Sequence, residues 1–277
     1  MIHAVAVSEF VGTSYYTPLK GEVKECMRQA ADIGYEGVEL HVRSPKQYDY
    51  AELGDYAANL GVKIVGLSTG GAVHFDGHYL TNPNSLARKE AIEVVKGFMQ
   101  AAKDCGGAAV MMCRMHGPLP DPKHRETYKD LFYESLIQTV ETAEKLGVEL
   151  TLEAANRFQA SYNWSADETL DFVNRFDSDK VTIHLDSFHM NIEDGDMPAA
   201  IRKCKDRLGY FHFSDNDRCY PGHGHIDFKS IVEALNDIGY MKNGIGAYEY
   251  DSIPDCITSA RLGLEHIKNI EKELGIL

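Results

Sequence analysis

The feature of this sequence that most restricts its fold is a regular alternation of short β-branched, apolar runs with longer segments of helical periodicity. Eight of the short runs are expected to form strands, at residues 4–7, 37–41, 63–67, 108–113, 149–153, 182–186, 210–213 and 246–249. Between them, apolar residues recur at spacings of three and four, most clearly over residues 23–33, 87–105, 128–146 and 257–274. This alternation favours parallel strands joined by right-handed helical crossovers.

Glycine marks the junctions between several of these helices and the strands that follow. The phrases Ile33-Gly34-Tyr35, Leu60-Gly61-Val62 and Leu146-Gly147-Val148 each place glycine where a left-handed helix cap would lead into a strand. Eight strand–helix units in 277 residues predict an α/β fold in which residues 1–277 form a single (β/α)8 TIM barrel. The alternative, a doubly wound open sheet, typically carries a G-x-G-x-x-G loop after its first strand, and residues 8–13 do not match that pattern.

Composition excludes several classes of function. The chain has 42 acidic and 28 basic residues, and its net charge of −14 disfavours nucleic acid and anionic membrane surfaces as partners. No apolar run approaches the roughly 20 residues of a membrane helix, and the first ten residues do not resemble a signal peptide. The six cysteines form no C-x-x-C motif, so we expect reduced thiols and a cytoplasmic location.

Four neighbouring strands are expected to end in residues that can bind a metal. These residues are Glu153, Asp186, His212 and Glu249, separated from one another by about one β/α unit. In a barrel of this type, the chemistry lies at the carboxyl ends of the strands. Three carboxylates placed together repel one another unless a cation neutralises them, and oxygen ligands with one imidazole suit Mn²⁺, Co²⁺, Mg²⁺ or Fe²⁺.

Other polar residues follow the same strands. His189 comes shortly after Asp186, and Arg218 comes shortly after His212. Either side chain can hold a hydroxyl or carbonyl oxygen of a polar substrate, although a loop hydrogen bond for His189 and a salt bridge for Arg218 are the alternatives.

At these residues the chain resembles the xylose-isomerase-like TIM-barrel sugar isomerases and epimerases. Within that superfamily it is most similar to the ketose 3-epimerases, a group that includes D-tagatose and D-psicose 3-epimerases and the related 5-keto-L-gluconate epimerases. The most specific stretches are residues 185–193, which are similar to the family motif D-T-F-H-M-N-I-E, and residues 212–228. The resemblance runs through nearly the whole chain.

The resemblance implies roles for individual residues. Glu153, Asp186, His212 and Glu249 match the metal ligands, and Glu153 and Glu249 also match the two catalytic carboxylates. His189 and Arg218 match residues that hold the carbonyl end of the substrate. The implied cofactor is one divalent ion, with Mn²⁺ expected first.

One position departs from the family. The motif E-x-x-N-R-[FY]-E, which begins at Glu153, ends here in Gln159, so an amide replaces a carboxylate that contacts substrate in the family. Because the amide lowers the negative charge at the mouth, we expect it to favour a substrate with negative charge or an extra acceptor at its carbonyl end. The alternative is that Gln159 only preserves a hydrogen bond and leaves the substrate preference unchanged. Arg43 or Arg114, each just beyond an expected strand, is expected to contribute a contact.

These observations predict a metal-dependent epimerase of a ketose or keto-sugar acid, which removes and returns a proton beside a metal-bound carbonyl through an enediolate. An aldose–ketose isomerase, or a dehydratase or lyase acting on an oxo-sugar, is the alternative that uses the same metal site. An abasic-DNA endonuclease on the same barrel fits the acidic charge poorly. The expected partner is a small keto-sugar or keto-sugar acid, and a homo-oligomer, dimer or tetramer, is expected.

Overall fold

The computed structural model of the protein describes residues 1–10 and 16–276, so part of the stretch searched for a glycine-rich loop lies outside the described residues. Within this part of the chain, eight parallel strands close into a barrel, because β1 pairs with β3 on one side and with β9 on the other. The ninth strand, β2, pairs with β1. The strands are β1 (Ile2–Ser8), β2 (Leu19–Lys20), β3 (Gly37–His41), β4 (Lys63–Ser68), β5 (Ala109–Met111), β6 (Leu150–Glu153), β7 (Val181–Asp186), β8 (Leu208–Phe213) and β9 (Ile245–Tyr248).

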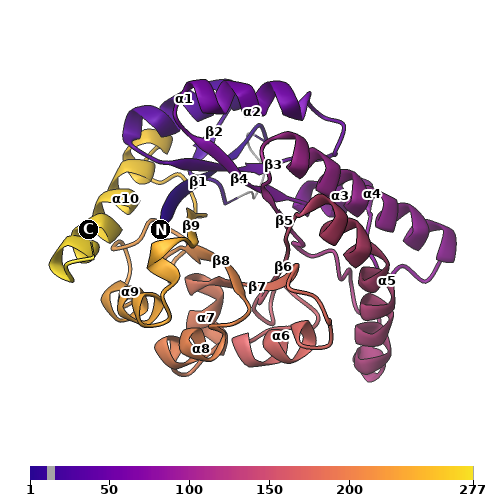
Figure 1. The fold of residues 1–277 in the computed structure, drawn as a ribbon. Helices are drawn as coiled ribbons and strands as arrows, with labels where there is room; N and C mark the ends of the chain where they lie inside the picture. Colours follow the sequence, from indigo (N-terminus) through magenta and orange to yellow (C-terminus); the bar gives the residue numbers. More distant parts are fainter. Residues whose placement is uncertain (11–15, 277) are drawn as a thin grey trace.

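The helices form a ring outside the strands (Figure 1). They are α1 (Val23–Ile33), α2 (Tyr50–Asn59), α3 (Gly70–Asp76), α4 (Ser85–Asp104), α5 (Arg125–Leu146), α6 (Ala166–Val173), α7 (Ser187–Glu193), α8 (Met197–Lys203), α9 (Phe228–Asp237) and α10 (Cys256–Glu273), with short 3₁₀ turns at Pro122–His124 and Tyr240–Lys242. Gly34 and Gly147 cap α1 and α5 in the left-handed conformation, with φ of +102° and +69°. The predicted role of these glycines is confirmed.

The buried apolar residues form two clusters. A large cluster lies between the strands and the helices, and it includes Val38, Leu40 and Leu67. A smaller cluster comprises mostly small side chains and the phenol of Tyr210: Ala4, Val65, Ala109, Met111, Tyr210 and Ala247. Ala4, Val65 and Tyr210 come from the first halves of their strands, whereas Met111 ends β5. Polar residues occupy the carboxyl ends of β6 and β7.

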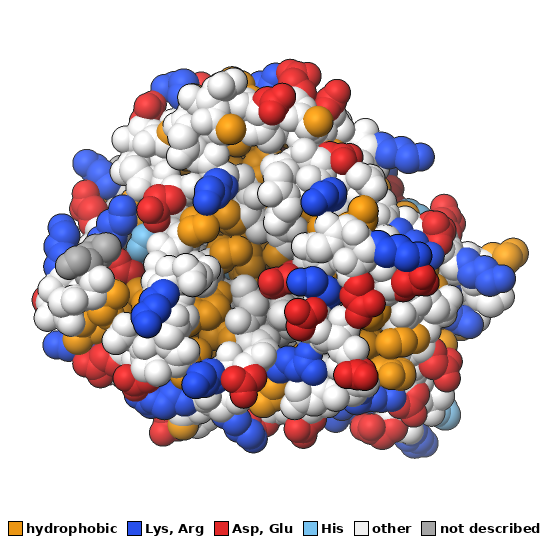
Figure 2. Space-filling model, in the orientation of Figure 1, with side chains coloured by type: hydrophobic (Ala, Val, Ile, Leu, Met, Phe, Trp, Pro, Cys, Tyr) orange, Lys and Arg blue, Asp and Glu red, His pale blue; other side chains and the backbone are white. Residues whose placement is uncertain are grey.

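The predicted (β/α)8 architecture is confirmed, with small differences at element boundaries. β5 is shorter than the expected strand 108–113, and Glu249 lies one residue beyond the end of β9. Acidic and basic side chains are interspersed over the visible face, which shows no continuous basic surface (Figure 2). Across the described residues, no helix is both long enough and apolar enough to pass through a bilayer.

Candidate active site and metal centre

The structure brings the four predicted metal ligands together at the carboxyl ends of neighbouring strands. Glu153 ends β6, Asp186 ends β7, His212 lies near the end of β8, and Glu249 follows β9. One ligand atom from each residue lies within 4.8 Å of the ligand atoms of the other three. We call this set the quartet. Asp186 and His212 are fully or almost fully buried, while Glu249 is 9% exposed.

Two residues of β3 support the quartet from across the barrel. Glu39 Oε2 lies 2.7 Å from His212 Nε2, and Glu39 Oε1 lies 2.6 Å from His41 Nε2. Burial alone would raise the pKa of Glu39, but its two histidine partners lower that pKa to about 2. Burial likewise opposes protonation of His212, yet the carboxylates of Glu39 and Glu249 raise its pKa well above the usual range. Glu39 therefore fixes the orientation of the His212 ring.

The second nitrogen of His212 provides a test of whether a metal fits this site. His212 Nδ1 is buried and has no hydrogen-bond partner within the described part of the chain. It lies 3.6 Å from Glu249 Oε2 and 3.9 Å from Asp186 Oδ2. A metal-binding histidine commonly holds a carboxylate on its other ring nitrogen, as His212 does with Glu39. The donor set, three carboxylates and an imidazole, fits a hard or borderline divalent ion.

Arg218 places a positive charge beside the same carboxylates. Its Nη1 donates to Asp186 Oδ2 at 2.6 Å, and its Nη2 donates to Glu249 Oε2 at 2.5 Å. The guanidinium lies 4.7 Å from the ring centre of Tyr16 and 4.6 Å from that of Phe188. Burial disfavours the charged guanidinium, but the carboxylates of Asp186 and Glu249 raise the pKa of Arg218 above its usual value. Arg218 is thus held in place by two carboxylates and two aromatic rings.

His189, at the start of α7, orients the other glutamate. His189 Nε2 lies 3.4 Å from Glu153 Oε1, and its Nδ1 accepts a hydrogen bond of 2.7 Å from the amide of Asn156. The amide oxygen of Asn156 accepts the N–H of Phe158, which leaves the amide nitrogen to face the ring. Nε2 therefore carries the ring proton and points it at Glu153. This contact keeps the pKa of Glu153 below its usual value despite burial.

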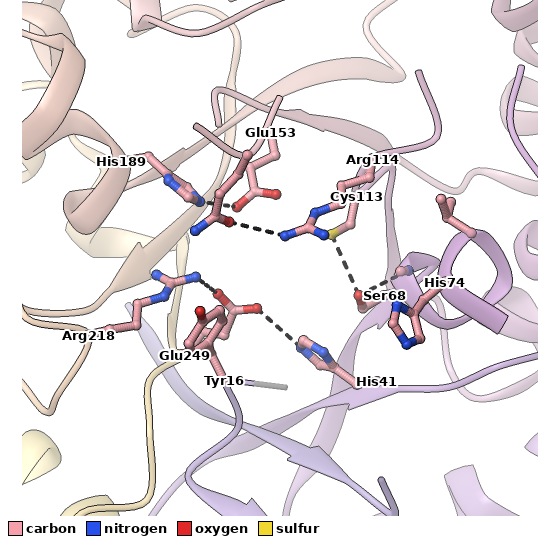
Figure 3. Close-up of a pocket in the computed structure, with 13 residues that line it drawn as sticks. Tyr16, His41, Ser68, His74, Cys113, Arg114, Glu153, His189, Arg218 and Glu249 are labelled. Atoms are coloured by element: carbon pink, nitrogen blue, oxygen red, sulfur yellow. Dashed lines mark hydrogen bonds and ion pairs between the residues drawn. The ribbon is translucent and has the colours of Figure 1, made fainter. Parts of the chain in front are cut away.

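A cavity of about 560 Å³ opens over these residues (Figure 3). Glu153 and Glu249 face it from the two ends of the arc of strands that carries the quartet. Arg114 also lines the cavity, and its Nη2 lies 3.3 Å from Gln159 Oε1. Arg43, the other arginine considered from the sequence, does not line it and is paired with Asp76.

The model of one protein family matches most of the chain. Residues 27–270 match the family described as "Xylose isomerase-like TIM barrel". The chain belongs to this family. Membership accounts for the barrel and for the position of the cavity at the carboxyl ends of the strands.

Named relatives of this family member are sugar epimerases. L-ribulose 3-epimerase of Mesorhizobium japonicum is 29% identical over 243 residues, which cover 85% of this chain and 78% of that protein. D-psicose 3-epimerase of Enterocloster bolteae is 42% identical over 107 residues, which cover 39% of this chain and 36% of the relative. A solved L-ribulose 3-epimerase superposes with a TM-score of 0.82 at 23% identity, covering 98% of this chain and 97% of the other. At that identity, the superposition supports the fold alone.

The seven residues selected from the sequence lie together around one cavity. Glu153, Glu249, His189, Arg218 and Gln159 line it, and Asp186 and His212 lie beneath them. Sequence reasoning missed Glu39 and His41, which point to the same face of β3. A carboxylate inside an otherwise apolar barrel strand is the signal that identifies Glu39. Arg157, in the turn after β6, pairs with Glu193 at 2.7 Å.

Proposed function

We propose that this protein is a divalent-metal-dependent epimerase that inverts a carbon beside the carbonyl of a ketose or keto-sugar acid. The quartet carries the proposal, because it combines a metal-ligand set with two glutamates that face one cavity. The named relatives, which epimerise L-ribulose and D-psicose at carbon 3, support the same chemistry. A 3-dehydro-D-guloside 4-epimerase of Escherichia coli, 26% identical over 58% of this chain, supports the reaction class without fixing the carbon.

Glu153, Asp186, His212 and Glu249 would hold the metal, for which we propose Mn²⁺. When bound, this ion supplies Lewis-acid stabilisation of the negative charge that develops on the sugar oxygens. The protein positions the substrate: we assign His189 and Arg218 to its polar oxygens at the carbonyl end. Both side chains are buried, and each is held by partners within the site.

Inversion of a carbon requires proton transfer on both of its faces. We assign removal of the proton to one of Glu153 and Glu249 and return of a proton to the other. A single base would tend to return the proton to the side from which it came. The contacts of Glu153 with His189 and of Glu249 with Arg218 orient the two carboxyl groups. In each direction of the reaction, one glutamate starts ionised and takes the proton, and the other starts protonated and gives its proton to the opposite face. The two exchange states in a turnover, and proton exchange with solvent restores the starting forms.

We also propose that residues 1–277 act as one catalytic domain, in the cytoplasm and as a homo-oligomer. The continuous ring of strands supports the single domain. All six cysteines are free thiols, which supports a reducing compartment. Size-exclusion chromatography with light scattering measures the assembly directly.

The function is tested by NMR in D₂O with the Mn²⁺-loaded protein and a panel of ketoses and keto-sugar acids. We expect deuterium to enter beside the carbonyl and the epimer to accumulate with the carbon skeleton unchanged. Formation of an aldose would indicate an isomerase, and elimination products would indicate a lyase. Absence of exchange with every member of the panel would overturn the proposal.

A further inference from the structure

Arg114 differs from Arg218 and Arg43 in having no acidic partner among the residues that the structure describes. Arg218 is paired with Asp186 and Glu249, and Arg43 is paired with Asp76. Among the described residues, the hydrogen bond recorded for the Arg114 side chain goes to the neutral amide of Gln159. The positive charge of Arg114 therefore faces the cavity without a paired carboxylate in the part of the chain that the structure describes.

The backbone holds Arg114 in a conformation that favours glycine. Its φ is +54°, and its carbonyl accepts the N–H of Gly117 at 2.8 Å to close a turn after β5. A side chain strains the backbone in this left-handed region. Arg114, Asn163 and Arg218 are the non-glycine residues with positive φ in the described part of the chain, and two of them line this cavity. A strained arginine at a site entrance is a reason to look for a ligand.

Gln159 leaves the charge of Arg114 available. Its backbone N–H donates to the carbonyl of Asn156 at 2.9 Å, in the turn after β6, and its side chain faces Arg114 across the cavity wall. A glutamate at this position would pair with Arg114 and cancel its charge. The amide accepts one guanidinium hydrogen bond and keeps its own N–H groups for a ligand.

We propose that Arg114 and Gln159 form a subsite for a carboxylate of the substrate, which makes the substrate a keto-sugar acid rather than a neutral ketose. The proposal rests on the function proposed above and narrows its substrate class. Arg114 presents a planar fork of donors that matches a carboxylate, and the amide of Gln159 adds a further donor. Arg218 is not the candidate for the carboxylate, because Asp186 and Glu249 already balance its charge. L-ribulose and D-psicose, the sugars that appear in the names of the relatives, carry no charge.

The test compares a ketohexose with the keto-acid in which the hydroxymethyl group at the carbonyl end is oxidised to a carboxylate. We expect the Mn²⁺-loaded protein to prefer the acid by at least tenfold in kcat/KM. Arg114→Gln and Gln159→Glu should each lower the ratio of acid to neutral activity at least tenfold. Arg43→Gln, a matched change of an arginine outside the cavity, should leave the ratio unchanged. An unchanged ratio in both cavity variants overturns the subsite.

Two further measurements separate this subsite from the proposed function. Isothermal titration of the Mn²⁺-loaded protein with a sugar acid that lacks the ketone measures binding without turnover, and Arg114→Gln should weaken it at least tenfold. If binding weakens but no substrate exchanges deuterium, the subsite stands and the epimerase proposal fails. If the neutral ketose is epimerised but the variants bind the acid normally, the epimerase proposal stands and the subsite fails. Preference for a ketohexose phosphate over the keto-acid would show that the ligand is a phosphate and would overturn the carboxylate assignment.

Discussion

The two halves of the barrel mouth contribute to the site in different ways. Strands β6 to β9 deliver the quartet, one residue from the end of each strand. Strands β1 to β5 contribute no member of the quartet, but Glu39 of β3 reaches across the barrel to hold His212. Arg114, after β5, forms part of the cavity wall. One half therefore carries the reacting groups, and the other sets their orientation and the shape of the cavity.

The largest effect is expected in the reacting half, from loss of either glutamate. Glu153→Gln and Glu249→Gln keep the shape of the side chain and remove the base, so epimerisation should fall at least about 100-fold in each variant. NMR of epimer formation measures the loss, and circular dichroism checks the fold. Glu141→Gln, on the exposed surface of α5, is the control and should retain full activity. Near-normal turnover in either glutamate variant would refute the two-base assignment.

Removal of the metal should have the next largest effect, again in the reacting half. Without a cation, the three carboxylates of the quartet repel one another, and the developing charge on the sugar is unsupported. Treatment with EDTA should lower activity about 100-fold or more and also lower Tm. Restoration by Mn²⁺, Co²⁺, Mg²⁺ and Fe²⁺ in turn ranks the ions. Full activity in protein shown by elemental analysis to be metal-free would contradict the assignment.

Glu39→Gln tests the supporting half. The amide retains a hydrogen bond to His212 but removes the charge that fixes the ring, so metal affinity should fall roughly 10–100-fold. Isothermal titration with Mn²⁺ measures the affinity, and excess Mn²⁺ should restore much of the activity. Glu52→Gln, which changes an exposed carboxylate on α2, is the matched control. If Glu39→Gln binds Mn²⁺ as well as the unmodified protein, the two halves are not coupled through His212.

The smallest effect concerns a carboxylate that lies on the reacting side but outside the quartet. Asp194 follows α7, and burial raises its pKa from 3.8 to about 6. Because the folded state favours the protonated form, the stabilisation is complete below pH 4 and is lost as the pH rises through 6. Asp194→Asn keeps the acceptor for the N–H of Ala166, so it should be more stable than the unmodified protein above pH 6, by about 1 kcal/mol after solvent screening. Urea unfolding at pH 4 and pH 7 checks this, and an equal difference at both values would contradict it.

Much of this arrangement could be predicted because it depends on strand order. The eight barrel strands are apolar runs separated by segments of helical periodicity, so their order along the chain could be predicted. Because the carboxyl ends of parallel strands meet at one face of a barrel, the residues that end these strands could be expected to lie together as the quartet. The two-residue strand β2 is too short to produce a pattern. The role of Glu39 depends on which face of β3 points inward, and the choice between Arg114 and Arg43 depends on Asp76, a partner 33 residues from Arg43. Such pairings arise from tertiary contacts that local periodicity does not encode.

The pairing of β1 with β9 has a consequence for the order in which the molecule assembles. Ile2 lies opposite Ile245, and Val5 lies opposite Tyr248, so the ring closes between the beginning and the end of the chain. Contacts of such long sequence separation carry a large loop-closure entropy and form slowly. During synthesis, the nascent sheet has β1 exposed at one edge and the most recently made strand at the other, and open edges promote association with other chains. The last strand therefore completes the site with Glu249 and, in the same step, removes both edges from the growing sheet.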